Sequence, residues 1–183
     1  MAADYLVSSL QPLALDGPPP YTAGQFLGLC RSQLSPADAD AIETLLGSLD
    51  EGPSGHRLLA RWRDLDTQLR NTIAAERARL RGQDAARWRR PATGCALYWT
   101  NRAAAAFQEK DPARRERLLD QVRWDAAGEL TPPAAPLSVA AVFTYAIRLA
   151  LVLRRAARDA AAGNDVFNRL TAASKIDFKE PRK

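Results

Sequence analysis

LSVAAVFTYAIRLALVLRRAARDAAA, residues 137–162, is the most continuously apolar segment of this chain. Mapped onto a helix of about 3.6 residues per turn, it is apolar over most of its circumference. Such a helix is buried among other helices or lies in a membrane. The uncharged run before Arg148 is shorter than the roughly 18 residues that a membrane span needs. We therefore predict a buried core helix whose narrow polar strip contains Thr144, Arg148, Arg155 and Arg158.

Start and stop signals divide the preceding sequence into shorter helices. Thr22 can cap a first helix. Two further helix starts are predicted at Ser35-Pro36 and Asp111-Pro112, where a capping side chain precedes a proline whose missing backbone N–H costs nothing at the first position of a helix. Further helices are expected over 96–108 and, from Asn164, in a last short segment. The longest helix is predicted over 56–81, with an apolar seam of Leu58, Trp62, Leu65, Leu69 and Ile73 that could pack along a partner helix.

The predicted fold is mainly α, a multi-helix bundle around the buried C-terminal helix. A short extended segment is expected at residues 5–10, and a flexible loop at 50–55. We expect one helical domain over residues 1–183, with two subdomains, 1–82 and 83–174, as an alternative. Residues 175–183 form a basic tail.

The charge of the chain is unevenly distributed. The net charge is +5, but the first fifty or so residues are acidic and arginine predominates from Arg57 onward. An arginine- and alanine-rich bias can reflect genomic base composition, so the basic balance alone does not predict a nucleic-acid partner. Nucleic acid is therefore not the partner that we expect.

Two cysteines and the first residues bear on the cellular compartment. Cys30 and Cys95 have no neighbouring His or Cys, which favours free, buried thiols in a reducing compartment and leaves a disulfide open. Residues 1–10 lack the basic and apolar regions of a secretory signal. A cytoplasmic location without a membrane span is the resulting expectation.

No arrangement of residues predicts catalysis or a cofactor. His56, the only histidine, lies at a Gly-rich helix start without a nucleophile pattern, which favours a solvent-exposed structural role. One histidine and two distant cysteines cannot supply the ligands of a zinc site. Gly24 and Gly28 lack the Gly-Lys that completes a phosphate-binding loop. We expect no enzyme activity, no metal, no cofactor and no small-molecule substrate.

The sequence Arg87-Trp88-Arg89-Arg90 is the main candidate for a binding site. Three roles stay open, in order of preference: packing of Trp88 beneath arginine stems, contact with an acidic protein surface, and phosphate binding with base stacking. Arg123 and Trp124 are further candidates for binding, and Trp124 lies off the apolar edge of its helix. Tryptophan is common both in cores and at the centres of interfaces.

Several ordered pieces of the chain resemble one bacterial family. They include the opening Tyr5-Leu6-Val7-Ser8-Ser9-Leu10-Gln11-Pro12-Leu13, followed by 26–30, 33–38 and 69–71. The match continues through Leu80-Arg81, 118–125, 143–161 and 163–167. The family is an uncharacterised one, a domain of unknown function encoded among the subunits of V/A-type ATP synthases. Residues 126–128 and 103–106 depart from its pattern.

This resemblance implies association with a rotary ATPase. The Arg-Trp segment and the helix after it also look similar to pieces of the helical C/d subunit of that enzyme, although the chain is short for its three-part funnel. Our first hypothesis is a cytoplasmic, non-catalytic accessory or assembly protein that binds soluble or stalk subunits of a V/A-type ATPase. The alternative is a small basic nucleic-acid-binding helical module.

Overall fold

The structure, a computed structural model, describes residues 2–47, 55–157 and 169. These residues form seven α-helices and no strand, so the predicted mainly α fold is confirmed for them. Three short 3-10 helices, η1 (Ala86–Trp88), η2 (Ala106–Gln108) and η3 (Gly128–Leu130), lie between the α-helices. The α-helices are α1 (Ala2–Ser9), α2 (Ala23–Gln33), α3 (Pro36–Gly47), α4 (Arg57–Leu80), α5 (Leu97–Ala105), α6 (Pro112–Ala127) and α7 (Val139–Ala156).

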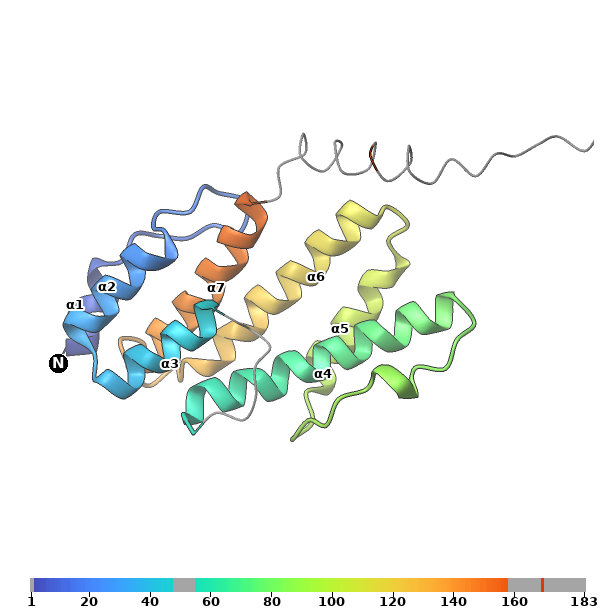
Figure 1. Ribbon diagram of the computed structural model, residues 1–183, viewed down its shortest axis with the longest axis horizontal. Coiled ribbons are helices and arrows are strands. Elements are labelled where there is room, and N and C mark those ends of the chain that lie inside the picture. Colours follow the sequence, from blue (N-terminus) through green and yellow to red (C-terminus); the bar gives the residue numbers. More distant parts are fainter. Residues whose placement is uncertain (1, 48–54, 158–168, 170–183) are drawn as a thin grey trace, which may run out of the picture.

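Helix α7 is the centre of the bundle, as its sequence predicts. In Figure 1 it lies between the group formed by α1, α2 and α3 and the long helix α6. It contacts all four of these helices and α4. Phe143 and Ala146 are completely buried, and even Thr144, on the predicted polar strip, is only 6% exposed. None of the described helices is both long and apolar enough to span a bilayer.

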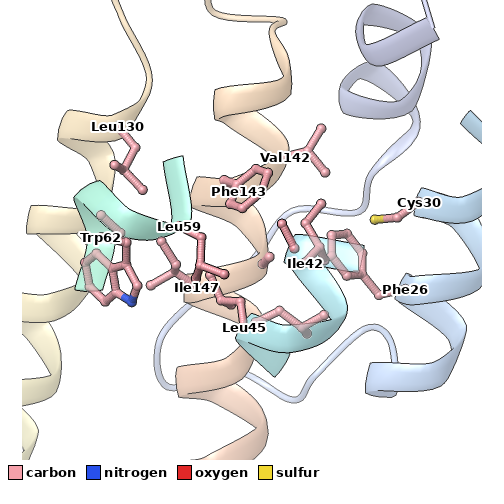
Figure 2. Close-up of a cluster of buried hydrophobic side chains, with 14 of the residues drawn as sticks. Phe26, Cys30, Ile42, Leu45, Leu59, Trp62, Leu130, Val142, Phe143 and Ile147 are labelled. Carbon is pink, nitrogen blue, oxygen red and sulfur yellow. The ribbon is translucent and has the colours of Figure 1, made fainter. Parts of the chain in front are cut away.

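A large hydrophobic cluster surrounds the first half of α7 (Figure 2). Phe143 and Ile147 of α7 lie in it, with Phe26 of α2 and Ile42 of α3 on one side. Trp62 of α4 closes the other side. Burying side chains of this size stabilises a fold by about 1.5–3 kcal/mol each relative to leaving them exposed. This cluster is therefore what fixes α7 among its neighbours.

A second cluster lies between the C-terminal half of α4 and helices α5 and α6. It contains Leu69 and Ile73 of α4, Trp99 of α5 and Leu119 of α6. Helix α4 contributes to both clusters, because Leu59 and Trp62 belong to the first and Leu69 and Ile73 to the second. The two clusters therefore divide the chain differently from the alternative subdomains 1–82 and 83–174.

The expected extended segment at residues 5–10 is wrong, because α1 is helical through Ser9. A lone strand would leave its backbone groups without a ladder partner, whereas a helix satisfies them within the segment. Leu6 is buried to 1% exposure, and Val7 and Leu10 pack against the first cluster. The helix and the residue after it thus place three apolar side chains against the bundle.

The predicted helix starts are confirmed by their capping contacts. Thr22 and Gln25 form a reciprocal capping box at the start of α2. The side chain of Asp111 accepts a hydrogen bond from the backbone N–H of Ala113 at 3.0 Å, directly before Pro112. The basic tail, most of the loop at 50–55 and, apart from residue 169, the predicted last helix from Asn164 lie outside the described residues.

Candidate functional site

The predicted Arg87–Arg90 segment lies on the surface beside α4 (Figure 1). All four of its side chains are exposed. Trp88 is 43% exposed, and the guanidinium of Arg87 lies over its ring at 5.2 Å. The preferred interpretation is therefore correct only in part, since an arginine covers Trp88 but the ring does not enter the core.

Polar side chains on one face of α4 hold this segment in place. Asn71 brackets Arg90: its Oδ1 accepts from the Arg90 backbone N–H at 2.9 Å, and its Nδ2 donates to the Arg90 carbonyl at 2.8 Å. One turn earlier, Gln68 binds the Thr93 carbonyl at 2.8 Å and the Ala96 N–H at 2.7 Å. Such two-ended amide contacts fix the register of a loop on a helix. These hydrogen bonds therefore hold the segment in a fixed position beside α4.

The turn that brings the segment back along α4 depends on a glycine. Gly82 has a φ of 63°, in the left-handed region that glycine adopts without steric cost. Two hydrogen bonds close this helix end, from Gly82 N–H to Arg79 O at 3.2 Å and from Gln83 N–H to Ala78 O at 2.9 Å. This double closure is the pattern of a helix that ends and reverses at a glycine.

A groove with a volume of about 610 Å³ lies between α4, the returning segment, α6 and the end of α7. We call it the arginine groove. Trp88 lines it together with polar and small apolar residues, and Glu116 is the one carboxylate among its lining residues. The arginines that line it are Arg70, Arg77, Arg81, Arg90, Arg123 and Arg154.

Two buried aspartates beneath the groove hold several of these arginines. Asp66 is 4% exposed and accepts from Arg70 Nε at 2.6 Å and from Arg123 Nε at 3.1 Å. Asp120 is 1% exposed and accepts from Arg154 at 2.5 Å. Buried carboxylates are stable in a fold only when they are paired in this way. The network therefore fixes guanidinium groups from three helices in one place.

The lining of the groove carries an excess of positive charge. Within the described residues, six lining arginines outnumber the three carboxylates Glu116, Asp66 and Asp120. Glu116 is itself engaged by Arg77 at 2.9 Å. Guanidinium groups remain charged at any physiological pH and bind carboxylates and phosphates through paired donors. Cations grouped in a concave surface raise the local concentration of anionic partners.

Arg123 and Trp124, although adjacent in sequence, belong to different surfaces. Successive helical residues point about 100° apart. The side chain of Arg123 is only 13% exposed and lines the arginine groove. Trp124 is half-buried on another face of α6, where the guanidinium of Arg148 lies 4.9 Å from its ring centre. Of the six predicted site residues, the structure thus brings Trp88, Arg90 and Arg123 together in the groove.

The predicted site does not include four of the arginines that line the groove: Arg70, Arg77, Arg81 and Arg154. The first three are seven and four residues apart, which places them along one side of α4. This spacing was available from the sequence as a signal. Arg154 had no such signal, because it reaches the groove only through the packing of α7 against α6.

Two expectations for reactive residues need correction. His56 is half-buried rather than solvent-exposed, because its Nε2 contacts Oδ1 of Asp38 at 2.9 Å and its ring stacks on Phe143 at 4.8 Å. Cys30 and Cys95 are free thiols, but only Cys30 is buried. Burial raises the pKa of Cys30 to about 12. In the described part of the chain, no three His, Cys, Asp or Glu side chains are grouped as a metal site would require.

Comparisons with family models, curated proteins and solved structures find no match to this chain.

Proposed function

We propose that this protein is a non-catalytic accessory or assembly protein that holds an acidic segment of a partner in the arginine groove. The observation that carries the proposal is the convergence of six arginines and the exposed Trp88 on one concave surface. We further propose that the partner is a soluble or stalk subunit of a V/A-type ATPase. The support for this partner is the sequence resemblance described above.

The shape of the groove favours a polypeptide segment. Its lining residues on α4 and at the C-cap of that helix run from Arg70 to Arg81, a rise of about 16 Å at 1.5 Å per residue. A surface of this length matches about three turns of a partner helix, whose glutamates or aspartates would face the arginines. Trp88, at 43% exposure, offers an aromatic surface of the kind that dominates binding energy in interfaces.

The chemistry of the lining residues supports binding rather than catalysis. Arginine cannot act as a general base, because it stays protonated in proteins. Glu116 is the lining residue with an ionisable proton acceptor, and Arg77 already engages it. No serine, cysteine or histidine lines the groove in the described part of the chain.

A nucleic-acid strand is the second candidate, because the exposed Trp88 is flanked by Arg87, Arg89 and Arg90. Stacking of bases on aromatic rings beside cations is how many proteins bind single strands. This candidate predicts binding to an RNA or DNA oligonucleotide that weakens steeply with added salt. Absence of a gel shift at low salt would remove it.

Co-purification tests the main proposal. Tagged soluble and stalk ATPase subunits would be used to retain the wild-type protein, Arg81→Glu and Arg31→Glu under gentle conditions. Arg81 lies in the groove, whereas Arg31 is on α2, on the other side of α7 (Figure 1). Both variants change the charge equally. We expect retention of the wild type and Arg31→Glu and loss of Arg81→Glu; if no subunit retains the wild type, the proposed partner is wrong.

A further inference from the structure

A second pocket, separate from the arginine groove, lies between the N-terminal segment and helices α6 and α7. Its volume is about 480 Å³, within the range of sites for small ligands. Most of its wall is apolar, formed by residues that include Val7, Leu10, Leu13, Ala141 and Trp124. Arg148 lines it as the charged residue. We call it the Arg148 pocket.

Arg148 is held in this pocket without an ion-pair partner among the described residues. Its guanidinium lies over the Trp124 ring at 4.9 Å, and its Nε donates to the Trp124 carbonyl at 3.2 Å. Asp125 is the nearby carboxylate, but it accepts from Arg102 at 3.0 Å. Burial lowers the pKa of Arg148, and the charge of Asp125 raises it in opposition. A half-buried cation in this position is stabilised further by any anion that reaches its two terminal nitrogens.

Gly128 leaves the space that the guanidinium occupies. A Cβ atom at this position would lie 3.3 Å from Nη2 of Arg148, closer than an ordinary contact. The φ of Gly128 is −59°, which any residue adopts, so backbone conformation does not require glycine here. The small residue therefore matters for the room beside Arg148.

The hydroxyl groups around the pocket cannot donate to a ligand. Tyr145 donates to the Gln11 carbonyl at 2.8 Å. Thr144 donates to the Ala127 carbonyl at 3.0 Å, so Thr131 must be the donor in their contact at 2.8 Å. Each hydroxyl has one hydrogen, and all three are engaged. Arg148 is consequently the charged donor of the pocket, beside the neutral side-chain N–H donors of Gln11 and Trp124, and it carries a single charge.

We propose that the Arg148 pocket binds a small monocarboxylate with an apolar body. One guanidinium matches one carboxylate through paired hydrogen bonds from its two terminal nitrogens. The hydrocarbon part of the ligand lies against Val7, Leu10 and Leu13. Such a molecule is a bound ligand rather than a substrate, and the proposal does not depend on the ATPase partner.

Titration with octanoate tests this proposal in the folded wild-type protein. Octanamide is the matched control, because it keeps the apolar chain and removes the charge. The readouts are the NMR signals of the Trp124 indole N–H and the Arg148 Nε–H, assigned with Trp124→Phe and Arg148→Gln. We expect saturable shifts with octanoate and binding of octanamide that is weaker by about tenfold or more, the value of a lost charged hydrogen bond.

Two variants complete the test. Arg148→Gln should weaken octanoate binding by about tenfold or more, and Gly128→Ala should also weaken it by crowding Nη2. Thermal unfolding would confirm that each variant is folded. No saturable shift in the wild type, or equal binding of octanoate and octanamide, would overturn the proposal without reference to any variant. Unchanged octanoate binding in folded Arg148→Gln would overturn it as well.

Discussion

Arg154, near the end of α7, donates to Oδ1 of Asp120 on α6 at 2.5 Å, although only 1% of Asp120 is exposed. The same carboxylate lies 3.7 Å from Arg123 and 3.6 Å from Arg155. This contact joins the central helix to the floor of the arginine groove. The Asp120 carboxylate therefore contributes both to the stability of the bundle and to the charge of the groove.

The first prediction concerns this shared aspartate. Asp120→Asn removes the negative charge from beneath three arginines, and removal of one partner of a buried ion pair costs about 3–5 kcal/mol. Because Arg154 and Arg155 are partly exposed, we expect a loss of about 2–3 kcal/mol in the free energy of unfolding. Urea unfolding monitored by circular dichroism measures it.

The control for Asp120→Asn is Glu43→Gln, which breaks the exposed pair of Glu43 and Arg31. Exposed pairs contribute about 0–1 kcal/mol, so this variant should unfold almost as the wild type does. Equal effects of the two substitutions would show that the Asp120 network does not support the fold.

The second prediction separates core from surface aromatic residues. Phe143 is completely buried, and Phe143→Ala should destabilise the protein by about 3–5 kcal/mol. Trp88 is 43% exposed, so Trp88→Ala should change stability by no more than about 0.5 kcal/mol. Urea midpoints of the two variants measure the difference. A large loss for Trp88→Ala would mean that the ring has a structural role.

The third prediction concerns the two thiols. Cys95 is exposed and Cys30 has no exposed surface, so a disulfide-exchange reagent should modify one thiol rapidly in the folded protein. The second thiol should react only after unfolding by urea, because both access and the raised pKa of Cys30 limit it. Mass spectrometry identifies each modified cysteine. Rapid modification of Cys30 without denaturant would contradict the packing of α2.

The fourth prediction is a loss of stability at alkaline pH. The folded state keeps the Cys30 proton up to a pKa of about 12, whereas the unfolded thiol loses it near 9.0. The contribution of this buried thiol to the free energy of unfolding is therefore present in full below pH 9.0 and is lost as the pH rises towards 12. The loss from this thiol at pH 10 is on the order of 1 kcal/mol.

Urea unfolding at pH 8 and pH 10 would measure this loss in the wild type and in Cys30→Ala, where it should be absent. Burial also raises the pKa of Tyr145, whose ordinary value is 10.0, so the comparison stays at or below pH 10. An identical pH dependence of the two proteins would show that the Cys30 thiol is not buried as described.

The sequence predicts those elements whose signals are local. The apolar circumference of α7 and the caps at Thr22 and Asp111 follow from residues within one or two turns, and the structure confirms them. The extended prediction for residues 5–10 is wrong because a segment of six residues is too short to show a distinctive period. Only the contacts of Leu6 with distant helices reveal its helical state.

The site was less predictable because its geometry depends on tertiary packing. Asn71 holds the backbone of Arg90, and Gln68 holds the backbone of Thr93 and Ala96, residues that are distant from α4 in sequence. Arg123 and Trp124 are adjacent in sequence, yet helical geometry sends them to different surfaces. Arg154 joins the groove only when α7 packs on α6.

The most direct test of the arginine groove is the affinity of the purified protein for the ATPase subunit that retains it, measured by calorimetry. We predict that Arg81→Glu and Trp88→Ala each weaken binding by about tenfold or more, and that Arg31→Glu changes it by less than about twofold. Added salt should weaken the wild-type complex. Equal affinities for the wild type, Arg81→Glu and Trp88→Ala would contradict a function for the groove in binding.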